Sequence, residues 1–576
     1  MRKSMAFSRT CVFLLLLSVA WWQASPATAT TWNVTQFGAN PNGSVDDTTA
    51  INNAIAAAQP GDTVYFPAGI YDITNSINAK AGVALMGAGA GSTSIKSLDP
   101  GGSGYSNIML NLANQSNVQV SNLTLNANND TNVGYGISAY SASGVNIHNV
   151  GIVNDPNAAI SVWTMTGATI ANNHVSNGGG IGLTGCTGCL TAGNVFTQCT
   201  GGVGDAGGSN ESIVNNTISL INQPSLDGGI VCMYIRGSNM LVQGNVMNHW
   251  MSCDTYLANS AIRNNVITAT DGSQSYAGIE MAGAANSDVF SGNVIIGGQG
   301  NGFTMTNNNL RQQMYYANNT VRGLAWGGMA AGWGGNTGEN QEVYLYANTF
   351  SGNAGTAFGF GGNCQNFVFD SNVFSGNGNM AVDYGGSTSP SLDKLQFVSN
   401  TFTNNAGGAI YSMPLTNQYF DSSNTVAGNG PNGSLPTTSG TFYNNMPTVS
   451  IVGSSTVSVG SLVNFSSLFN DPGGYLAANY LWDLGDGLPV TTSTASFTYS
   501  QTGTYDVGLV VWDSLGRAAH EQLVLTVTAA GAGSQSVDGG ALGTAADPAS
   551  VPEPSAAIMT VVAVLTAAVF TSRRRV

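Results

Sequence analysis

Three polar side chains in the middle of the chain could carry acid–base chemistry: Arg236, Asp254 and Glu280. Two carboxyl groups held close together can act as an acid and a base, because their proximity raises the pKa of one. In the cleavage of a glycosidic bond, a separation of about 5 Å gives retention of configuration and about 6.5–9.5 Å gives inversion. A guanidinium beside the pair could bind a substrate oxygen. The alternative is that Asp254 and Glu280 are solvated surface carboxylates.

These residues belong to a sequence repeat that must position them. Between residues 117 and 426, short alternating apolar runs are followed by Asn and two more strand-like residues, about every 25 residues. The runs are rich in β-branched and aromatic residues and are interrupted by Gly and Asn. The pattern predicts an all-β fold, a right-handed parallel β-helix of about 13 coils. We expect one corner of the coils to carry a column of hydrogen-bonded asparagines with tolerance for left-handed backbone angles: Asn122, Asn149, Asn173, Asn194, Asn216, Asn245, Asn265, Asn293, Asn319, Asn348, Asn372, Asn400 and Asn424.

Alignment of the strands before each Asn corner gives the expected register of the candidate groups. Glu280 follows Ile279 as Ser138 follows Ile137, so Glu280 is expected to face outward after a buried residue. The same offset places Asp254 outward one coil earlier, and Arg236 one coil before Asp254. The three side chains would then share one outer surface of the β-helix.

Other side chains near that surface could bind a substrate or a cation. We predict sugar-stacking aromatics, with ordinary packing as the alternative for each: Trp163, Tyr256, Trp326 and Trp333. A hydrolase would need no cofactor. A lyase could use Arg236 as its base and Ca²⁺ bound by Asp205 and Asp227, whose orientation depends on loops that the pattern does not place.

The cysteines give weaker signals. Cys186-x-x-Cys189 lacks the second pair or the histidines of common zinc sites, so we interpret it as a local disulfide or as packed thiols. Cys232 and Cys253 occupy nearly equivalent places in adjacent coils, where they could stack or form a disulfide.

The start of the repeat region resembles a known superfamily. Residues 37–39 (FGA), 46–55 (DDTTAINNAI) and 61–71 (GDTVYFPAGIY) are similar to the opening of pectate-lyase-like β-helices. The resemblance implies catalysis on the outside of one parallel sheet. Asp46 or Asp47 is expected to cap a helix that covers the end of the β-helix. The Gly-His-Gly and Arg-x-Lys motifs of polygalacturonases are absent from the sequence.

Composition shifts divide the chain into further segments. Residues 1–29 are expected to be a signal peptide, and residues 30–440 the β-helix. Residues 447–528 resemble a PKD domain, an immunoglobulin-like sandwich with Trp482 buried. Residues 529–550 are typical of a flexible linker. Residues 551–576 resemble a PEP-CTERM sorting signal with its transmembrane segment, which implies export by a Gram-negative bacterium and a partner in the sorting machinery of the inner membrane.

Charge narrows the classes of partner. The net charge is −15, and without the two terminal segments Lys+Arg falls from 14 to 8 and Asp+Glu from 29 to 28, a balance of −20. Such a surface excludes nucleic acid and repels an acidic polysaccharide unless a cation bridges them, which favours a neutral glycan. The sequence predicts an exported glycoside hydrolase or polysaccharide lyase acting on an extracellular polysaccharide. The alternative is a non-catalytic surface protein for glycan binding or adhesion.

Overall fold

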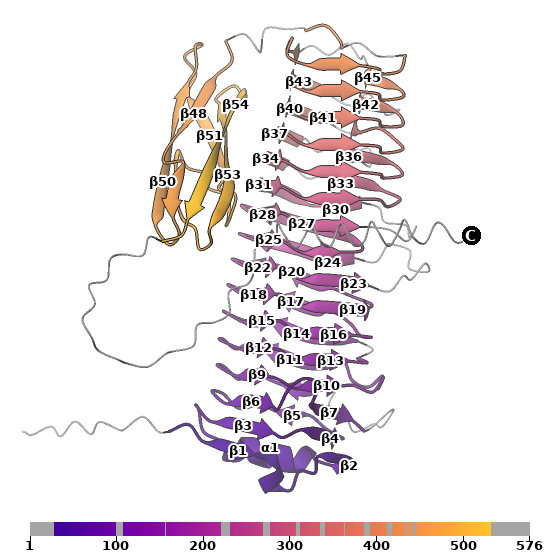
Figure 1. The fold of residues 1–576 in the computed structure, drawn as a ribbon, viewed down its shortest axis with the longest axis vertical. Coiled ribbons are helices and arrows are strands. Elements are labelled where there is room, and N and C mark those ends of the chain that lie inside the picture. The colour runs from indigo at the N-terminus through magenta and orange to yellow at the C-terminus, as the bar shows by residue number, and fades with distance from the viewer. Residues whose placement is uncertain are drawn as a thin grey trace, which may run out of the picture.

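The computed structural model describes most of the chain between residues 28 and 530. The described ranges are 28–98, 108–155, 157–220, 231–268, 277–306, 311–333, 340–361, 363–384, 392–411, 417–431, 435–438, 442 and 445–530. Figure 1 shows a long stack of coils with a β-sandwich beside its upper part. The predicted all-β class, with a parallel β-helix followed by a sandwich, is confirmed. Within the described part of the chain, no helix has the length and apolar content to cross a membrane.

Each coil of the β-helix contributes strands to three faces. Face A carries the candidate groups, and its strands pair in parallel: β5 (Ile77–Asn78), β8 (Ile108–Asn111), β11 (Tyr135–Tyr140), β14 (Ala158–Trp163), β17 (Ile181–Thr184), β20 (Val203–Ala206), β24 (Val231–Ser238), β27 (Trp250–Ala258), β30 (Ala277–Met281), β33 (Asn301–Thr306), β36 (Gly327–Trp333), β39 (Phe358–Phe360), β42 (Met380–Asp383) and β45 (Gly408–Ile410).

Face B follows face A around each coil. It extends from β1 (Thr31–Asn33) to β46 (Gln418–Phe420). Its strands in the region discussed below are β18 (Leu190–Ala192), β22 (Ser212–Val214), β25 (Leu241–Gln243), β28 (Ala261–Arg263), β31 (Ala284–Ser291), β34 (Arg311–Ala317), β37 (Asn340–Tyr346), β40 (Cys364–Asp370) and β43 (Leu392–Val398). Face C is a sheet of 16 strands from β2 (Asn42–Asp46) to β47 (Thr425–Ala427).

The interior is built from columns of equivalent apolar residues. On face A, Ile137 pairs with Ile160, which pairs with Ile181, and all three are buried. Stacked aromatic rings fill the upper coils, such as Phe369 on Phe397 with centroids 4.6 Å apart. Because apolar side chains alternate with outward ones, each strand buries one row and presents the other to its surroundings.

The predicted asparagine column is confirmed from Asn173 to Asn424. Asn216 shows the pattern: its backbone N–H and its side-chain Nδ2 both donate to Oδ1 of Asn245 in the next coil, at 2.9 Å. From Asn172, at φ 55°, to Ser399, the residue before each corner adopts the left-handed conformation. The amides from Asn173 to Asn400 are therefore buried and hydrogen-bonded, and the half-buried Asn424 continues the same row of hydrogen bonds. This makes these asparagines structural.

The prediction was wrong for two members of the column, Asn122 and Asn149. Asn122 and Asn149 have φ of 58° and 54° and lie at the left-handed position, so they precede the corner. Val150 occupies the column position and donates its N–H to Asn173 Oδ1 at 3.0 Å. A second asparagine column, from Asn353 through Asn377 and Asn405 to Asn429, was not foreseen.

A helix covers the lower end of the β-helix, as expected. Helix α1 (Thr48–Ala57) buries Ile51, Ala54 and Ile55 against the first coils. Asp46 accepts a hydrogen bond from the Thr48 backbone N–H at 3.0 Å, so Asp46 caps the helix although Asp47 is the first flanking residue. The helix lies across the end of the stack in Figure 1 and covers its open edge.

The C-terminal module is a sandwich of two sheets. One sheet has the order β48 (Thr448–Val452), β50 (Leu462–Asn470), β52 (Thr494–Thr498); the other has β49 (Thr456–Ser458), β54 (Ala518–Thr528), β53 (Gly503–Asp513), β51 (Ala477–Asp483). Trp482 is buried, as predicted, and its Nε1 donates to the Thr492 carbonyl at 2.8 Å. Tyr499 ties the sheets together by donating its hydroxyl to the Leu484 carbonyl at 2.7 Å.

The sandwich packs directly on face B of the upper coils. Val289, Tyr315 and Tyr344 of the β-helix form one buried cluster with residues of the sandwich, among them Leu481 and Trp512. The two modules are therefore in firm contact rather than joined by a linker alone (Figure 1).

Polar groups join the same interface. Arg263 and Asp483 form a buried ion pair at 2.9 Å. The Tyr315 hydroxyl lies 2.8 Å from Nε2 of His520, and Asn479 donates to Glu342 at 3.3 Å. Burial lowers the pKa of His520 to about 3, so this imidazole is neutral near pH 7 and its Nε2 can accept a hydrogen bond from the Tyr315 hydroxyl.

Candidate functional site

The candidate catalytic groups lie on three consecutive strands of face A. Arg236 is on β24, Asp254 on β27 and Glu280 on β30. Tyr234 pairs with Ser252, and Ser252 pairs with Glu280. The Glu280 side chain is half-buried, as is that of Arg236. The fold thus brings together strands that are far apart in sequence, as the repeat predicted.

The expected alignment of Asp254 with Glu280 was wrong by two residues. The neighbour of Glu280 is Ser252, and Cys253 pairs with Met281 rather than with Ile279. Inward positions recur every second residue along a strand, so a slip of two preserves the apolar pattern and cannot be detected from it. Strand β27 has 9 residues, and its pairing with β24 contains register shifts. These irregularities explain why the observed register differs from the register expected from the sequence alignment.

The corrected register separates the two acidic residues along the strand. Two residues span about 6.6 Å and one strand spacing about 4.8 Å, which places the Asp254 and Glu280 Cα atoms about 8 Å apart. Arg236 follows Ile235, which pairs with Cys253, but the register shifts before the next pair, Gly237 with Leu257. Arg236 therefore lies opposite the segment 254–256 rather than in register with Asp254 alone. The side chain of Asp254 lies outside the described residues.

The carboxylate of Glu280 affects the pKa of a thiol inside the β-helix. Burial raises the pKa of the Cys253 thiol, and the carboxylates of Asp288 and Glu280 raise it further. Cys253 is a free, buried thiol that pairs with Ile235, so the expected equivalence with Cys232 was wrong. The reason is a register shift between Val231 and Met233 in the pairing of β24 with β27, which leaves Cys232 without a partner position on β27.

The predicted aromatic residues are exposed but do not converge. The side chains of Trp163, Tyr256 and Trp326 are 51%, 48% and 46% exposed. Trp163 lies on β14, Tyr256 on β27 and Trp326 just before β36, so they are spread over many coils. Tyr256 alone shares a strand with a candidate catalytic residue. Trp163 instead pairs in register with the exposed Tyr140 of the preceding coil, a neighbouring pair of rings on face A. The Trp333 side chain lies outside the described residues.

Asp205, an expected calcium ligand of the lyase alternative, does not face the outer surface of face A. Asp205 pairs with Leu183 in an inward column and is fully buried. Burial raises the pKa of its carboxyl group. Strand β20 keeps the alternation of its neighbours, which turns Asp205 inside the coil. Asp227, the other expected ligand, lies outside the described residues.

Family models match most of the two modules. Residues 31–223 match "Rhamnogalacturonase A/epimerase, pectate lyase-like", residues 158–321 match "Right handed beta helix region", and residues 444–528 match "PKD domain". The chain is a pectate-lyase-like right-handed β-helix protein with a PKD domain. The resemblance in its opening residues and in its C-terminal module is thereby confirmed.

Relatives of this β-helix protein act on polysaccharides, as their names state. It is 38% identical over 114 residues to mannuronan C5-epimerase AlgE5 of Azotobacter vinelandii, covering 18% of this chain and 11% of the epimerase. It is 35% identical over 118 residues to alginate lyase 7 of the same organism, covering 18% of this chain and 13% of the lyase. The matches therefore span only about a tenth of each relative's length. Among solved structures, the catalytic unit of a GH87 α-1,3-glucanase from Streptomyces thermodiastaticus is similar at 18% identity and a TM-score of 0.35, over 71% of this chain and 70% of that one.

Proposed function

We propose that this protein acts on an extracellular polysaccharide through the outer surface of face A at β24, β27 and β30. The observation that carries the proposal is the placement of Arg236, Asp254 and Glu280 on three consecutive strands of one sheet. The polysaccharide-active relatives and the pectate-lyase-like match support it. Export to the cell surface or extracellular matrix, as the terminal segments suggest, would bring the protein to such a substrate.

The corrected register favours one division of roles for hydrolysis. We assign inversion to this pair, a course in which a water molecule lies between carboxyl groups about 6.5–9.5 Å apart. Glu280, whose side chain is half-buried, is the proposed general acid. Asp254 would then act as the base, and Arg236 would hold a substrate oxygen.

A second candidate function is modification of a uronate polymer by elimination or epimerisation. The observation that favours it is the similarity to a mannuronan C5-epimerase and an alginate lyase. Removal of the proton at C5 needs a base, a role that Arg236 could fill on face A. We derive no step through calcium, because the described Asp205 carboxylate faces the interior.

Product analysis on a substrate panel distinguishes these functions. The intact protein would be incubated with mannuronan, alginate, polygalacturonate and α-1,3-glucan. New reducing ends without unsaturation indicate hydrolysis, ultraviolet-absorbing unsaturated ends indicate elimination, and a changed sugar composition without cleavage indicates epimerisation. Binding without any product would support the alternative of a non-catalytic glycan-binding protein.

Carboxamide variants test the residues themselves. Loss of a general acid or base costs about 10²–10⁴-fold in turnover, so Glu280→Gln and Asp254→Asn should each lower kcat by that order. Asp506→Asn is the matched control, because Asp506 is an exposed carboxylate on the sandwich. The assignment would be falsified if the double variant cleaved a substrate at the wild-type rate.

A further inference from the structure

Two buried thiols lie at the corner between faces A and B. Cys186 and Cys189 occupy the turn between β17 and β18, and both are free and buried. Glu211 lies at the equivalent corner of the next coil, because Leu190 pairs with Ser212 and the Ser212 N–H donates to the Cys189 carbonyl at 3.0 Å. Glu211 therefore stacks on Cys189, although 21 residues of sequence separate them.

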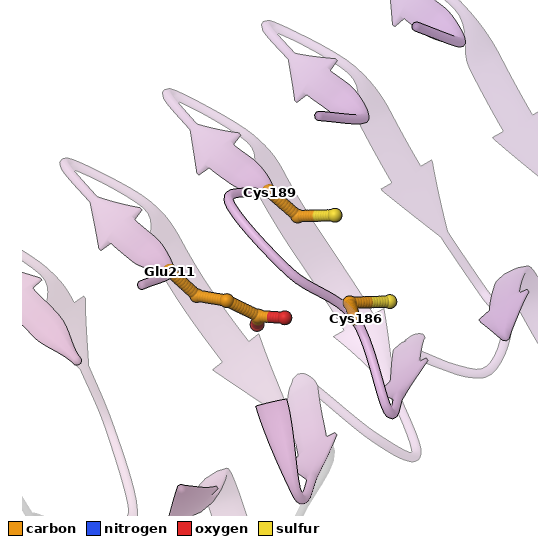
Figure 2. A group of neighbouring side chains, drawn as sticks. All are labelled: Cys186, Cys189 and Glu211. Atoms are coloured by element: carbon orange, nitrogen blue, oxygen red, sulfur yellow. The ribbon is translucent and has the colours of Figure 1, made fainter. Parts of the chain in front are cut away.

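The three side chains converge inside the coil. Figure 2 shows both thiols and the Glu211 carboxylate directed to the same side of the chain. The two Sγ atoms and a carboxylate oxygen all lie within 4.8 Å of one another. Thiolate and carboxylate are both zinc ligands, at about 2.3 Å for sulfur and about 2.0–2.2 Å for oxygen. Ligand atoms around a tetrahedral zinc ion are about 3.5 Å apart, so shifts of about 1 Å would close the set.

The Glu211 carboxylate has no ordinary partner to explain its burial. Its side chain is 1% exposed, and among the described residues no amide, hydroxyl or cationic group donates to either of its oxygens. Asp205 is its polar neighbour, and Oδ1 of Asp205 accepts from the Gly208 N–H at 3.1 Å. Two carboxyl groups and two thiols thus share one enclosed space with no positive charge among them.

The backbone leaves room for this cluster. A Cβ atom at Gly208 would lie 2.4 Å from Glu211 Oε1 and 2.9 Å from Asp205 Oδ2. The carboxylates therefore occupy the space that any larger residue at position 208 would fill. Burial, followed by a hydrogen bond with Asp205 and by the charge of Asp205, raises the pKa of Glu211 to about 10. A bound cation would reverse this, since it stabilises the ionised carboxylate and thiolates.

We propose that Cys186, Cys189 and Glu211 bind a zinc ion inside the β-helix. Asp205 lies beyond Glu211 and orients its carboxylate through their contact. The ion would join two successive coils at the point where β20 and the short strand β21 (Gly208–Ser209) interrupt the regular corner. Because such a site is enclosed, zinc would bind as the coils fold and release the protons of its ligands. A Cys186–Cys189 disulfide is the competing structure.

Metal content and thiol state of the full chain test the proposal. Protein produced with added ZnSO₄ should contain one zinc per chain, with both thiols alkylated only after denaturation with chelator. Replacement by Co²⁺ should give sulfur-to-cobalt charge-transfer absorption, which requires no variant. Metal-free protein that contains a Cys186–Cys189 disulfide under these conditions would overturn the proposal.

Variants assign the ligands. Cys186→Ser and Glu211→Gln should lose the bound zinc, and Asp205→Asn should weaken zinc binding about 10–100-fold, as loss of an orienting partner does. Cys199→Ser is the matched control, because Cys199 is another buried free thiol of the same region and should keep one zinc. If Cys186→Ser folds and retains a full equivalent, the site is not formed by these residues. If it does not fold, the cobalt spectrum of the wild-type protein decides.

Discussion

Faces A and B of the same coils have opposite surroundings. On face B, the outward residues Val289, Tyr315 and Tyr344 are buried under the sandwich. On face A, the outward column of β27, β30 and β33 contains Ser252, Glu280 and Thr304. Ser252 and Thr304 are buried and Glu280 is half-buried, but none of the three belongs to the cluster that packs against the sandwich. The interior rows of both faces are apolar and equivalent. The outward residues therefore distinguish the face that docks the sandwich from the face on which we propose that a substrate binds.

The largest effect on the docking of the sandwich is expected from loss of the Arg263–Asp483 ion pair on face B. Arg263→Ala would leave Asp483 buried without its partner, which typically costs about 3–5 kcal/mol. The sandwich should then detach or unfold at a lower temperature than the coils, visible as two calorimetric transitions and as new protease sensitivity. The double variant Arg263→Met, Asp483→Leu should recover most of the loss, because neither charge remains buried. Detachment that also abolished activity on face A would contradict the separation of the two faces.

At pH 5 and above, a smaller effect is expected from acid. The pKa of His520 is about 3 in the docked state and about 6.5 when the imidazole is exposed. Between about pH 3 and pH 6.5, the undocked state therefore binds more protons than the docked state. Docking should therefore weaken as the pH falls below about 6.5, by about 1.4 kcal/mol per pH unit, and the loss should level off near pH 3. The rings of Tyr315, Tyr344 and Tyr346 face this imidazole.

The His520→Gln variant isolates that contribution. Glutamine does not titrate, but its side-chain oxygen can still accept a hydrogen bond from the Tyr315 hydroxyl. The sandwich of this variant should therefore stay docked on the β-helix as the pH falls. Other groups at the interface titrate equally in both proteins and cancel in the difference between them. The interpretation fails if wild type and variant lose the sandwich contact at the same pH, as followed by the unfolding transition of the sandwich.

The sequence was sufficient for the architecture because the fold repeats its own pattern. The period, the Asn corners and the opening motif predicted the β-helix, its end helix and the buried Trp482, since each depends on local residue types. It was insufficient for register, because a slip of two residues at Cys253 leaves the alternation unchanged. It also missed the partnership of Cys189 with Glu211, which exists only after one coil stacks on another. Asp205 was misplaced for the same reason, since its neighbours come from other coils.

The smallest effect is expected from the exposed rings of face A. Trp163 is 51% exposed and pairs with Tyr140 of the preceding coil, so removing it opens no cavity in the interior. Trp163→Ala should change the free energy of unfolding by less than about 0.5 kcal/mol, as surface substitutions do. If the two rings stack on a sugar, the variant should weaken glycan binding by about 0.5–1.5 kcal/mol, measured by calorimetry. Val524→Ala is the control, because Val524 is an exposed apolar residue of the sandwich. Equal glycan binding by wild type and Trp163→Ala would confine substrate contact to the strands from β24 upward. An equal loss of binding in Trp163→Ala and Val524→Ala would indicate non-specific adsorption rather than a binding site on face A.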